Sequence, residues 1–428
     1  MTVLRVEGGH PLVGEVRTAG SKNSALALMA ASLLTREASH LENVPHLADV
    51  DNTIGILEDL GARCSRNEWE VAIDASAVDG SEVSETRARK MRASILFMGP
   101  LLARTGRAVV PKPGGDDIGM RRVEQHVYGL VQLGATVEEA HDAFVCSADR
   151  LHGAEVVLDM PTVTGTENIL MAASLAEGRT TILNAAREPH VTDLANALTG
   201  MGAEIRGIGT DTIVVDGVES LGGLDHRVTP DYLEAGTYAL AAAAAGGDVL
   251  ISDAPVGDLT TLVLKLRQAG VTVEEGANWL RVVREGPLVP IHLITWTYPG
   301  FATDLQPQYT ALMTQATGDT IIQEFIFENR FTYIDELCRM GADIQLGQHG
   351  RSIRVAGPTA LHPAVVTIPD IRSGAALLIA ALCAEGPSDL RGVEHLHRGY
   401  EDMTGKLSRL GSQVQEVRDD DPPAAAQA

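Results

Sequence analysis

The feature that most constrains the fold of this 428-residue chain is a sixfold internal repeat. In each copy a helical pattern ends in a five-residue motif, as in Met201-Gly-Ala-Glu-Ile. The first and last positions of the motif are apolar, the second is glycine, the third is small and the fourth is variable. The glycines are Gly61, Gly134, Gly202, Gly270, Gly341 and Gly411, and neighbouring copies lie 68 to 73 residues apart. Such regular self-similarity indicates repeated supersecondary units, each large enough to be a folding unit in its own right.

Each copy predicts two helices and several short strands. The repeated glycine stands where a helix ends, so we expect it to adopt the left-handed conformation that terminates many helices. Segments such as Thr212-Ile-Val-Val-Asp then read as strands. The other helix of each copy, which precedes the one that ends at the repeated glycine, is Ala-rich. It is apolar nearly all round and therefore belongs in a core. Clear examples are expected at residues 169–178, 237–247, 309–318 and 375–386. Six copies predict an α/β protein of two domains with three units each.

Composition excludes several classes of partner. The chain has 57 acidic and 34 basic residues, for a formal net charge of −23, and such a surface repels nucleic acid and anionic lipid. It shows neither an apolar run of the roughly 18 residues that span a bilayer nor a secretion signal, so we expect a cytoplasmic protein. The cysteines Cys64, Cys146, Cys338 and Cys383 are scattered singly, which argues against a zinc site or a disulfide framework.

Six motifs accompany the repeat. They are Gly20-Ser-Lys-Asn-Ser, Lys90-Met-Arg-Ala-Ser, Pro113-Gly-Gly-Asp-Asp-Ile-Gly, Asn184-Ala-Ala-Arg-Glu-Pro, Thr303-Asp-Leu-Gln and Arg398-Gly-Tyr-Glu. With the repeat, they resemble the enolpyruvyl transferases from about residue 3 to residue 416, and they are specific in combination. The resemblance implies transfer of the enolpyruvyl group of phosphoenolpyruvate to a hydroxyl of a uridine nucleotide, by addition and elimination, without metal or cofactor.

The resemblance also implies two inside-out α/β domains, each of three βαβαββ-type units, with the active site in the cleft between them. We expect the first domain at residues 21–229, with a lid loop at 111–122, and the second at residues 1–20 and 230–418. Residues 419–428 are rich in Asp, Pro and Ala, which predicts a disordered tail. The protein is expected to be a monomer.

Binding two anionic substrates requires fixed cations, preferably guanidinium forks. By the resemblance these are Lys22, Arg92, Arg121, Arg330, Arg372 and Arg398, with Lys22 and Arg398 counted as catalytic. Lys22 precedes a helix expected at residues 24–34, whose N-terminal amides would add to its attraction for an anion.

The reaction needs a base for the acceptor hydroxyl and an acid for carbon. By the resemblance, Asp304 is the base, Asn23 orients the acceptor and Asp370 belongs to the substrate site. From the residues alone, Asp304 is equally well suited to be the N-cap of a helix at 305–314.

The carbon acid is where the chain departs from the usual family pattern. Most members carry a reactive cysteine after the Gly-Gly pair of the lid loop, and epoxide antibiotics of the fosfomycin kind alkylate it. Here Asp116 follows Gly114 and Gly115, as in a minority of the family. A carboxyl acid must be held protonated near neutral pH. Asp117 is a second candidate, and a polar surface turn is the plainer interpretation of the Gly-Gly-Asp-Asp segment.

By the resemblance, two segments contact the uridine end of the acceptor. Their residues are Arg121, Arg122, Val123 and Glu124 in the first, and Thr162, Val163 and Thr164 in the second. Ile326 is implied as a further substrate-binding residue. Arg122 replaces the usual proline, and His397 replaces the usual aspartate before Arg398.

The sequence leaves open three acceptor substrates and one function without catalysis. The leading prediction is the 3-hydroxyl of UDP-N-acetylglucosamine, in peptidoglycan precursor synthesis. The alternative is the 3′-hydroxyl of UMP in nucleoside-antibiotic synthesis, where Arg122 would hold a terminal phosphate. Shikimate 3-phosphate is disfavoured by the lid motif. A non-catalytic binding paralogue is disfavoured because the charged motif residues occur together.

Overall fold

A computed structural model of the chain describes residues 2–140 and 142–418, so the tail predicted at 419–428 lies outside the described residues. The described chain divides into two compact units. The C-terminal unit comprises residues 2–19, 117–121 and 230–418, and the N-terminal unit comprises residues 20–116 and 122–229.

The C-terminal unit contains three sheets of four strands each, and each sheet includes one parallel pair. The first sheet has the order β21 (Val365–Thr367), β22 (Pro387–Arg391), β1 (Thr2–Glu7) and β23 (Gln413–Arg418). The second has the order β15 (Thr272–Glu275), β16 (Trp279–Arg284), β14 (Gly247–Ser252) and β2 (Leu12–Arg17). The third has the order β17 (Leu293–Ile294), β18 (Gly318–Gln323), β20 (Ser352–Gly357) and β19 (Asp343–Leu346).

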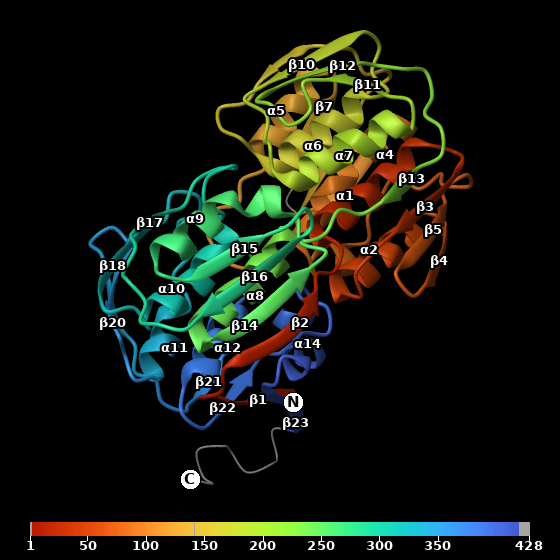
Figure 1. Ribbon diagram of the computed structural model, residues 1–428. Coiled ribbons are helices and arrows are strands. Elements are labelled where there is room, and N and C mark those ends of the chain that lie inside the picture. Colours follow the sequence, from red (N-terminus) through yellow and green to blue (C-terminus); the bar gives the residue numbers. More distant parts are fainter. Residues whose placement is uncertain (1, 141, 419–428) are drawn as a thin grey trace. The chain divides into compact units, whose positions relative to one another are not determined.

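The first two strands of the chain are built into this unit. Strand β1 is antiparallel to both of its neighbours, so that Leu4 lies opposite Leu390 on one side and Glu416 on the other. Strand β2 runs parallel to β14, with Val16 opposite Ile251. Figure 1 shows the red N-terminal strands beside green and blue ones from much later in the sequence.

Three helices form the centre of the C-terminal unit. Helices α8 (Tyr232–Ala245), α10 (Gln306–Met313) and α12 (Ile371–Cys383) pack against one another and are buried almost all round. Helices α8 and α12 are rich in alanine, whose small side chains allow close packing, and burial of nonpolar side chains stabilises the unit. The remaining helices are α9 (Thr260–Gln268), α11 (Ile334–Arg339), α13 (Glu394–His397) and α14 (Met403–Arg409), with 3₁₀ turns at Val256–Leu259 and Thr303–Leu305.

The N-terminal unit has the same plan. Its first sheet has the order β13 (Asp225–Arg227), β3 (Ala38–Glu42), β5 (Glu70–Asp74) and β4 (Arg63–Asn67). The second has the order β11 (Glu204–Arg206), β12 (Thr212–Asp216), β10 (Arg179–Leu183) and β9 (Glu155–Val157). The third has the order β6 (Arg107–Pro111), β8 (Ala143–Ser147) and β7 (Thr136–Glu139). In the last sheet Glu82 forms an isolated parallel bridge to Val109, where the other sheets have a fourth strand.

The helices of the N-terminal unit include two that are buried almost completely, α1 (Lys22–Ala31) and α6 (Val163–Ala173). The others are α2 (Ala48–Asp59), α3 (Glu85–Ala88), α4 (Met98–Thr105), α5 (Glu124–Gln132) and α7 (Pro189–Gly200), with 3₁₀ turns at Ser32–Leu34 and Arg92–Phe97. Within the described part of the chain, no helix is long and apolar enough to span a membrane.

The repeat glycines confirm the prediction made for them. All six have φ between 86° and 105° and directly follow the C-cap residues of α2, α5, α7, α9, α11 and α14. A residue with a side chain would be strained in this left-handed region, which explains why glycine recurs at the same place in every unit.

The Ala-rich helices were predicted in the core, and they lie there, but their predicted bounds are wrong. All four begin earlier than expected and end before the following glycine. In α8 and α12 the reason is a capping residue outside the apolar run: Asp231 and Asp370 accept hydrogen bonds from the first backbone amides.

Candidate active site

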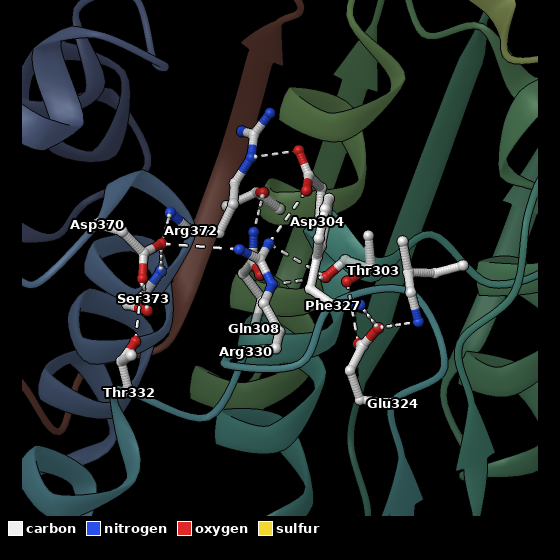
Figure 2. Close-up of polar contacts among 12 residues, drawn as sticks. Thr303, Asp304, Gln308, Glu324, Phe327, Arg330, Thr332, Asp370, Arg372 and Ser373 are labelled. Atoms are coloured by element: carbon white, nitrogen blue, oxygen red, sulfur yellow. Dashed lines mark hydrogen bonds and ion pairs between the residues drawn. The ribbon is translucent and has the colours of Figure 1, made fainter. Parts of the chain in front are cut away.

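Four charged residues of the C-terminal unit form what we call the Asp304 cluster: Asp304, Arg330, Asp370 and Arg372. Asp304 lies in the 3₁₀ turn Thr303–Leu305. One of its carboxylate oxygens accepts a hydrogen bond from Arg330 Nη2 at 3.1 Å, and the other accepts one from Arg372 Nε at 3.1 Å. Figure 2 shows the carboxylate between the two guanidinium groups. The sequence named all four residues, and the structure brings them together.

Arg330 is the most deeply buried member of this cluster, with 1% of its surface exposed. Its Nε and Nη2 also donate to the Thr303 carbonyl at 3.3 and 3.2 Å, and its Nη1 lies 3.9 Å from Asp370. A buried charge is tolerated only when it is paired and hydrogen-bonded. The neighbouring carboxylates therefore hold this guanidinium, together with the ring of Phe327 at 6.0 Å.

Asp370 positions Arg372. It is the N-cap of α12 and accepts hydrogen bonds from the backbone amides of Arg372 at 2.9 Å and Ser373 at 3.0 Å. Its second oxygen accepts from Thr332 Oγ1 at 3.2 Å. Arg372 is thereby fixed in the first turn of the helix, 5.3 Å from the ring of Tyr400, and its buried Nη1 has no hydrogen-bond partner among the described residues. A buried, unpartnered guanidinium donor is costly unless it binds something, and an anionic ligand is the suitable partner.

The alternative role of Asp304 as a helix cap does not fit the geometry. Helix α10 begins at Gln306, its N-cap position is Leu305, and no side chain of the described residues caps it. Asp304 lies one residue further back, and its carboxylate is held by cations.

Glu324, which the sequence did not single out, fixes the surroundings of Asp304. It is 1% exposed, and one of its oxygens accepts from the backbone amides of Ile326 at 2.7 Å and Phe327 at 3.1 Å. The other oxygen accepts from Thr303 Oγ1 at 3.0 Å (Figure 2). Glu324 therefore ties the turn that carries Asp304 to the segment that carries Ile326 and Arg330. Nothing in the sequence around a lone Glu at a strand end would have revealed this.

Part of the predicted lid loop packs within the C-terminal unit. Asn329 donates from its backbone amide to the Ile118 carbonyl at 3.1 Å and from its side chain to the Asp117 carbonyl at 3.2 Å. The guanidinium of Arg121 lies 5.9 Å from the ring of Phe327, close enough for a cation–π contact. Arg121 and Arg330 thus share one aromatic ring.

The start of the same loop packs within the N-terminal unit. A Cβ atom at Gly114 would lie 1.8 Å from the Arg89 carbonyl oxygen, so only glycine fits there. Asp116 is half-buried, whereas Asp117 is exposed. Arg92, a predicted substrate contact, begins the 3₁₀ turn Arg92–Phe97 and is half-buried.

Lys22 lies inside the first turn of α1, so the helix predicted at 24–34 is wrong at both ends. Ser21 supplies the N-cap, and α1 ends at Ala31, where a 3₁₀ turn continues the chain. Lys22 is buried, with its Nζ 3.3 Å from Asp49 Oδ2. The neighbouring Asn23 is half-buried. An ammonium group in the first helical turn adds its charge to the N-terminal amides, as an anion site requires.

Apart from Arg121, which belongs to the C-terminal unit, the two segments predicted at the uridine end occupy two helix starts in the N-terminal unit. Thr162 is the residue before α6, and Val163 and Thr164 begin that helix. Val123 precedes α5 and Glu124 begins it, while Arg122 is exposed. His126 of α5, which sequence reasoning missed, is buried, and its Nε2 lies 3.1 Å from Thr164 Oγ1. A single histidine on a helix carried no signal of this contact.

The two residues of the C-terminal motif differ in their surroundings. Arg398 is half-exposed at the end of α13. His397 is exposed, and its Nε2 lies 2.8 Å from Glu416 Oε1 on the neighbouring strand β23. The unusual histidine therefore belongs to a surface pair with Glu416. Among residues 2–140 and 142–418, no group of three or more His, Cys, Asp and Glu side chains could hold a metal ion.

Glu167 of α6 offers a test of the electrostatics of this unit. It is 1% exposed, and within the part of the chain that the structure describes its Oε1 has no hydrogen-bond partner. Burial, aided by the nearby Glu188, raises the pKa of Glu167 well above its ordinary value. Because the folded state keeps a proton that the unfolded state releases, the contribution of Glu167 to stability is complete below its unfolded pKa and declines as the pH rises.

We therefore expect Glu167→Gln to gain stability relative to wild type between pH 5 and pH 8, by up to about 1.4 kcal/mol for each pH unit. Urea unfolding of both proteins across this range measures the difference. The exposed Glu155→Gln is the matched control and should show no such trend. Parallel stability curves for wild type and Glu167→Gln would contradict a protonated Glu167.

Comparison with known proteins places this arrangement in a family. The family model described as EPSP synthase (3-phosphoshikimate 1-carboxyvinyltransferase) matches residues 6–407. The chain is 47% identical over 419 residues to UDP-N-acetylglucosamine 1-carboxyvinyltransferase of Sorangium cellulosum, covering 97% of this chain and 99% of the relative. It is 44% identical over 413 residues to the enzyme of the same name from Halothermothrix orenii, covering 96% and 99%.

Solved structures agree on the fold. The enolpyruvyl transferase NikO from Streptomyces tendae is 27% identical, covers 97% of this chain and 99% of its own, and superposes with a TM-score of 0.88. EPSP synthase from Acinetobacter baumannii, at 20% identity, superposes with a TM-score of 0.74 over 98% of this chain and 100% of its own and shows the fold alone. The predicted fold class is thus confirmed, and the chain belongs to the EPSP synthase family of enolpyruvyl (1-carboxyvinyl) transferases.

Proposed function

We propose that this chain transfers the enolpyruvyl group of phosphoenolpyruvate to the 3-hydroxyl of UDP-N-acetylglucosamine, with release of inorganic phosphate, in peptidoglycan precursor synthesis. The observation that carries the proposal is the carboxylate of Asp304 held between Arg330 and Arg372, because it combines a base with cations that suit an anionic substrate. The nearly full-length similarity to two proteins named for this reaction supports the choice of acceptor. We place the reaction in the cytoplasm and expect a monomer.

The reaction proceeds by addition and elimination. In the addition, the acceptor oxygen bonds to C2 of phosphoenolpyruvate, loses its proton to Asp304, and C3 gains a proton from Asp116. In the elimination, the bond from C2 to the phosphate oxygen breaks, phosphate leaves with the electron pair, and C3 loses a proton to restore the double bond. A positioned acid or base typically accelerates such a step by about 10²–10⁴-fold.

Different cations of the site are assigned to the two anionic substrates. We assign phosphoenolpyruvate to Lys22, Arg121, Arg372 and Arg398, four of the cations that the family resemblance implies; Arg121 also begins the segment at the uridine end. The unpartnered Nη1 of Arg372 supports its part in this. Arg330 keeps Asp304 in place, and Asp370 keeps Arg372 in place. Asn23, Arg92, Ile326 and the segments Arg122–Glu124 and Thr162–Thr164 are assigned to the nucleotide acceptor.

Phosphate release with alternative acceptors tests the proposal. The purified protein is incubated with phosphoenolpyruvate and, separately, with UDP-N-acetylglucosamine, UMP or shikimate 3-phosphate. Release with UDP-N-acetylglucosamine at the highest kcat/KM is expected. Preference for UMP would move the protein to nucleoside-antibiotic chemistry, and no release with any acceptor would favour a binding paralogue.

Arg122 provides a more specific test of the acceptor end. It is exposed and replaces the usual proline beside the segment assigned to uridine. We expect Arg122→Pro to change the KM for the nucleotide several-fold while the KM for phosphoenolpyruvate stays nearly constant, because the substitution affects only the acceptor contacts. Steady-state kinetics with each substrate varied in turn gives both values. The reverse pattern would place Arg122 on the phosphoenolpyruvate side.

A further inference from the structure

A buried chain of hydrogen bonds in the N-terminal unit ends at Thr164, at the start of α6. The backbone amide of Gly99 donates to Asn168 Oδ1 at 2.7 Å. Asn168 Nδ2 lies 2.9 Å from the Ile95 carbonyl and 3.0 Å from His126 Nδ1. His126 Nε2 lies 3.1 Å from Thr164 Oγ1. The chain therefore runs from the interior of the unit to a half-buried hydroxyl.

Donors and acceptors fix the direction of every bond in this chain. A backbone amide only donates, so the atom of Asn168 that faces Gly99 must be the oxygen. The Asn168 nitrogen then has two hydrogens, one for the Ile95 carbonyl and one for His126. His126 Nδ1 must therefore accept. No rotation of the amide satisfies the Gly99 amide and the Ile95 carbonyl together in any other way.

The remaining nitrogen of His126 must carry the hydrogen. Burial, with a smaller contribution from the Arg92 charge, lowers the pKa of His126 to about 3, so the ring is neutral at physiological pH. A neutral imidazole has one N–H, and with Nδ1 accepting, that N–H is on Nε2. It donates to Thr164 Oγ1. Within the described residues this hydroxyl makes no second hydrogen bond, so its own hydrogen is available to a ligand.

We infer that His126 is a positioning residue for the acceptor substrate: it holds Thr164 so that the hydroxyl donates a hydrogen bond to an oxygen of the uridine nucleotide. The inference rests on the proposed function for the identity of that nucleotide. Thr164 is in the first turn of α6, where backbone amides also point outward and favour an electronegative partner. The buried chain engages the Thr164 hydroxyl through one lone pair of its oxygen and leaves its hydrogen available for donation. This favours acceptors with a carbonyl or phosphate oxygen at that point.

The first experiment removes the hydroxyl. Thr164→Val keeps the branched shape and should raise both the KM and the Kd for UDP-N-acetylglucosamine about tenfold, as expected for one lost hydrogen bond. The KM for phosphoenolpyruvate should change little. Thr164→Ser should recover most of the nucleotide affinity. Thr199→Val in α7, a threonine outside the site, controls for the substitution itself.

The second experiment observes the histidine directly. Nitrogen chemical shifts of His126 in the ¹⁵N-labelled wild-type protein should report the neutral form with its hydrogen on Nε2 down to pH 5. His126→Asn keeps an acceptor for Asn168 but removes the donor to Thr164. In the Thr164→Val background it should therefore add little to the loss of nucleotide affinity.

The outcomes separate this inference from the proposed function. Calorimetric binding of UDP-N-acetylglucosamine needs no turnover, so a protein that binds the nucleotide but does not release phosphate contradicts only the proposed function. Unchanged nucleotide affinity in Thr164→Val, or a hydrogen on His126 Nδ1, would overturn the inference. The nitrogen shifts decide the matter even if His126→Asn does not fold.

Discussion

Wild-type protein incubated with fosfomycin and phosphoenolpyruvate is expected to stay active and unmodified, whereas Asp116→Cys should lose activity with time and gain one covalent adduct. The epoxide alkylates a thiolate at this position of the lid loop, and a carboxyl group is a much poorer nucleophile. Asp116→Cys should keep appreciable activity, since cysteine is the residue that most of the family carries there. Activity assays and intact mass at successive times measure both effects.

The cysteines of the chain offer no substitute target. Burial raises the pKa of the Cys64, Cys146 and Cys383 thiols to about 12, and it also raises the pKa of Cys338. All four are therefore overwhelmingly thiols near neutral pH. The helix-end and Ala-rich contexts of Cys64, Cys338 and Cys383 predict that these three are buried, and this prediction is wrong. Cys338 is exposed and Cys64 and Cys383 are half-buried, whereas Cys146 is buried.

Asp116→Ala completes the experiment. If Asp116 is the carbon acid, this variant should lose most of its turnover, by about 10²–10⁴-fold. An adduct on the wild-type protein, or full activity in Asp116→Ala, would contradict the assignment. Asp117, the adjacent carboxyl group, would then be the acid to test.

Asp304→Asn is expected to lower kcat by about 10²–10⁴-fold with the fold intact, because the amide cannot take the proton of the acceptor hydroxyl. It is nearly isosteric, so the contacts of Arg330 and Arg372 are weakened rather than removed. Circular dichroism and thermal unfolding confirm the fold, and phosphate release gives kcat.

The chain provides a matched control for this substitution. Asp319 pairs with Arg354 at 2.8 Å on the exposed surface of the third sheet of the C-terminal unit. Asp319→Asn breaks a comparable ion pair outside the site and should keep its turnover. Near-normal turnover in Asp304→Asn would reduce Asp304 to an electrostatic partner of the two arginines.

The sequence predicted those features of the fold that depend on local chemistry. The six glycines after helices could be assigned because a left-handed residue is needed at each helix end, whatever the unit packs against. The Ala-rich core helices could be recognised for the same reason, but their starts could not. Asp370 caps the start of α12 by accepting hydrogen bonds from backbone amides of that helix. A polar residue before an apolar run can have many other roles, so the sequence alone does not identify it as the cap.

The sequence identified individual residues of the candidate site through the family resemblance, but it did not predict the contacts between them. Asp304, Arg330 and Arg372 were named one by one, but their contacts join residues 26 and 68 positions apart. Only the packing of α10 and α12 brings them together. Glu324 and His126 were missed because each acts through neighbours that are distant in sequence. The roles of Glu324 and His126 depend on their burial and their hydrogen-bond partners, and neither can be inferred from the residue type alone.

The most direct test of the central claim is the product formed from phosphoenolpyruvate and UDP-N-acetylglucosamine. Mass spectrometry of the reaction mixture should show the nucleotide gaining one carboxyvinyl group in place of a hydrogen, with one phosphate released for each product molecule. In heavy water the vinyl carbon should also acquire deuterium, because C3 is protonated during addition and deprotonated during elimination. An unmodified nucleotide after prolonged incubation, or phosphate release without the carboxyvinyl product, would contradict the account.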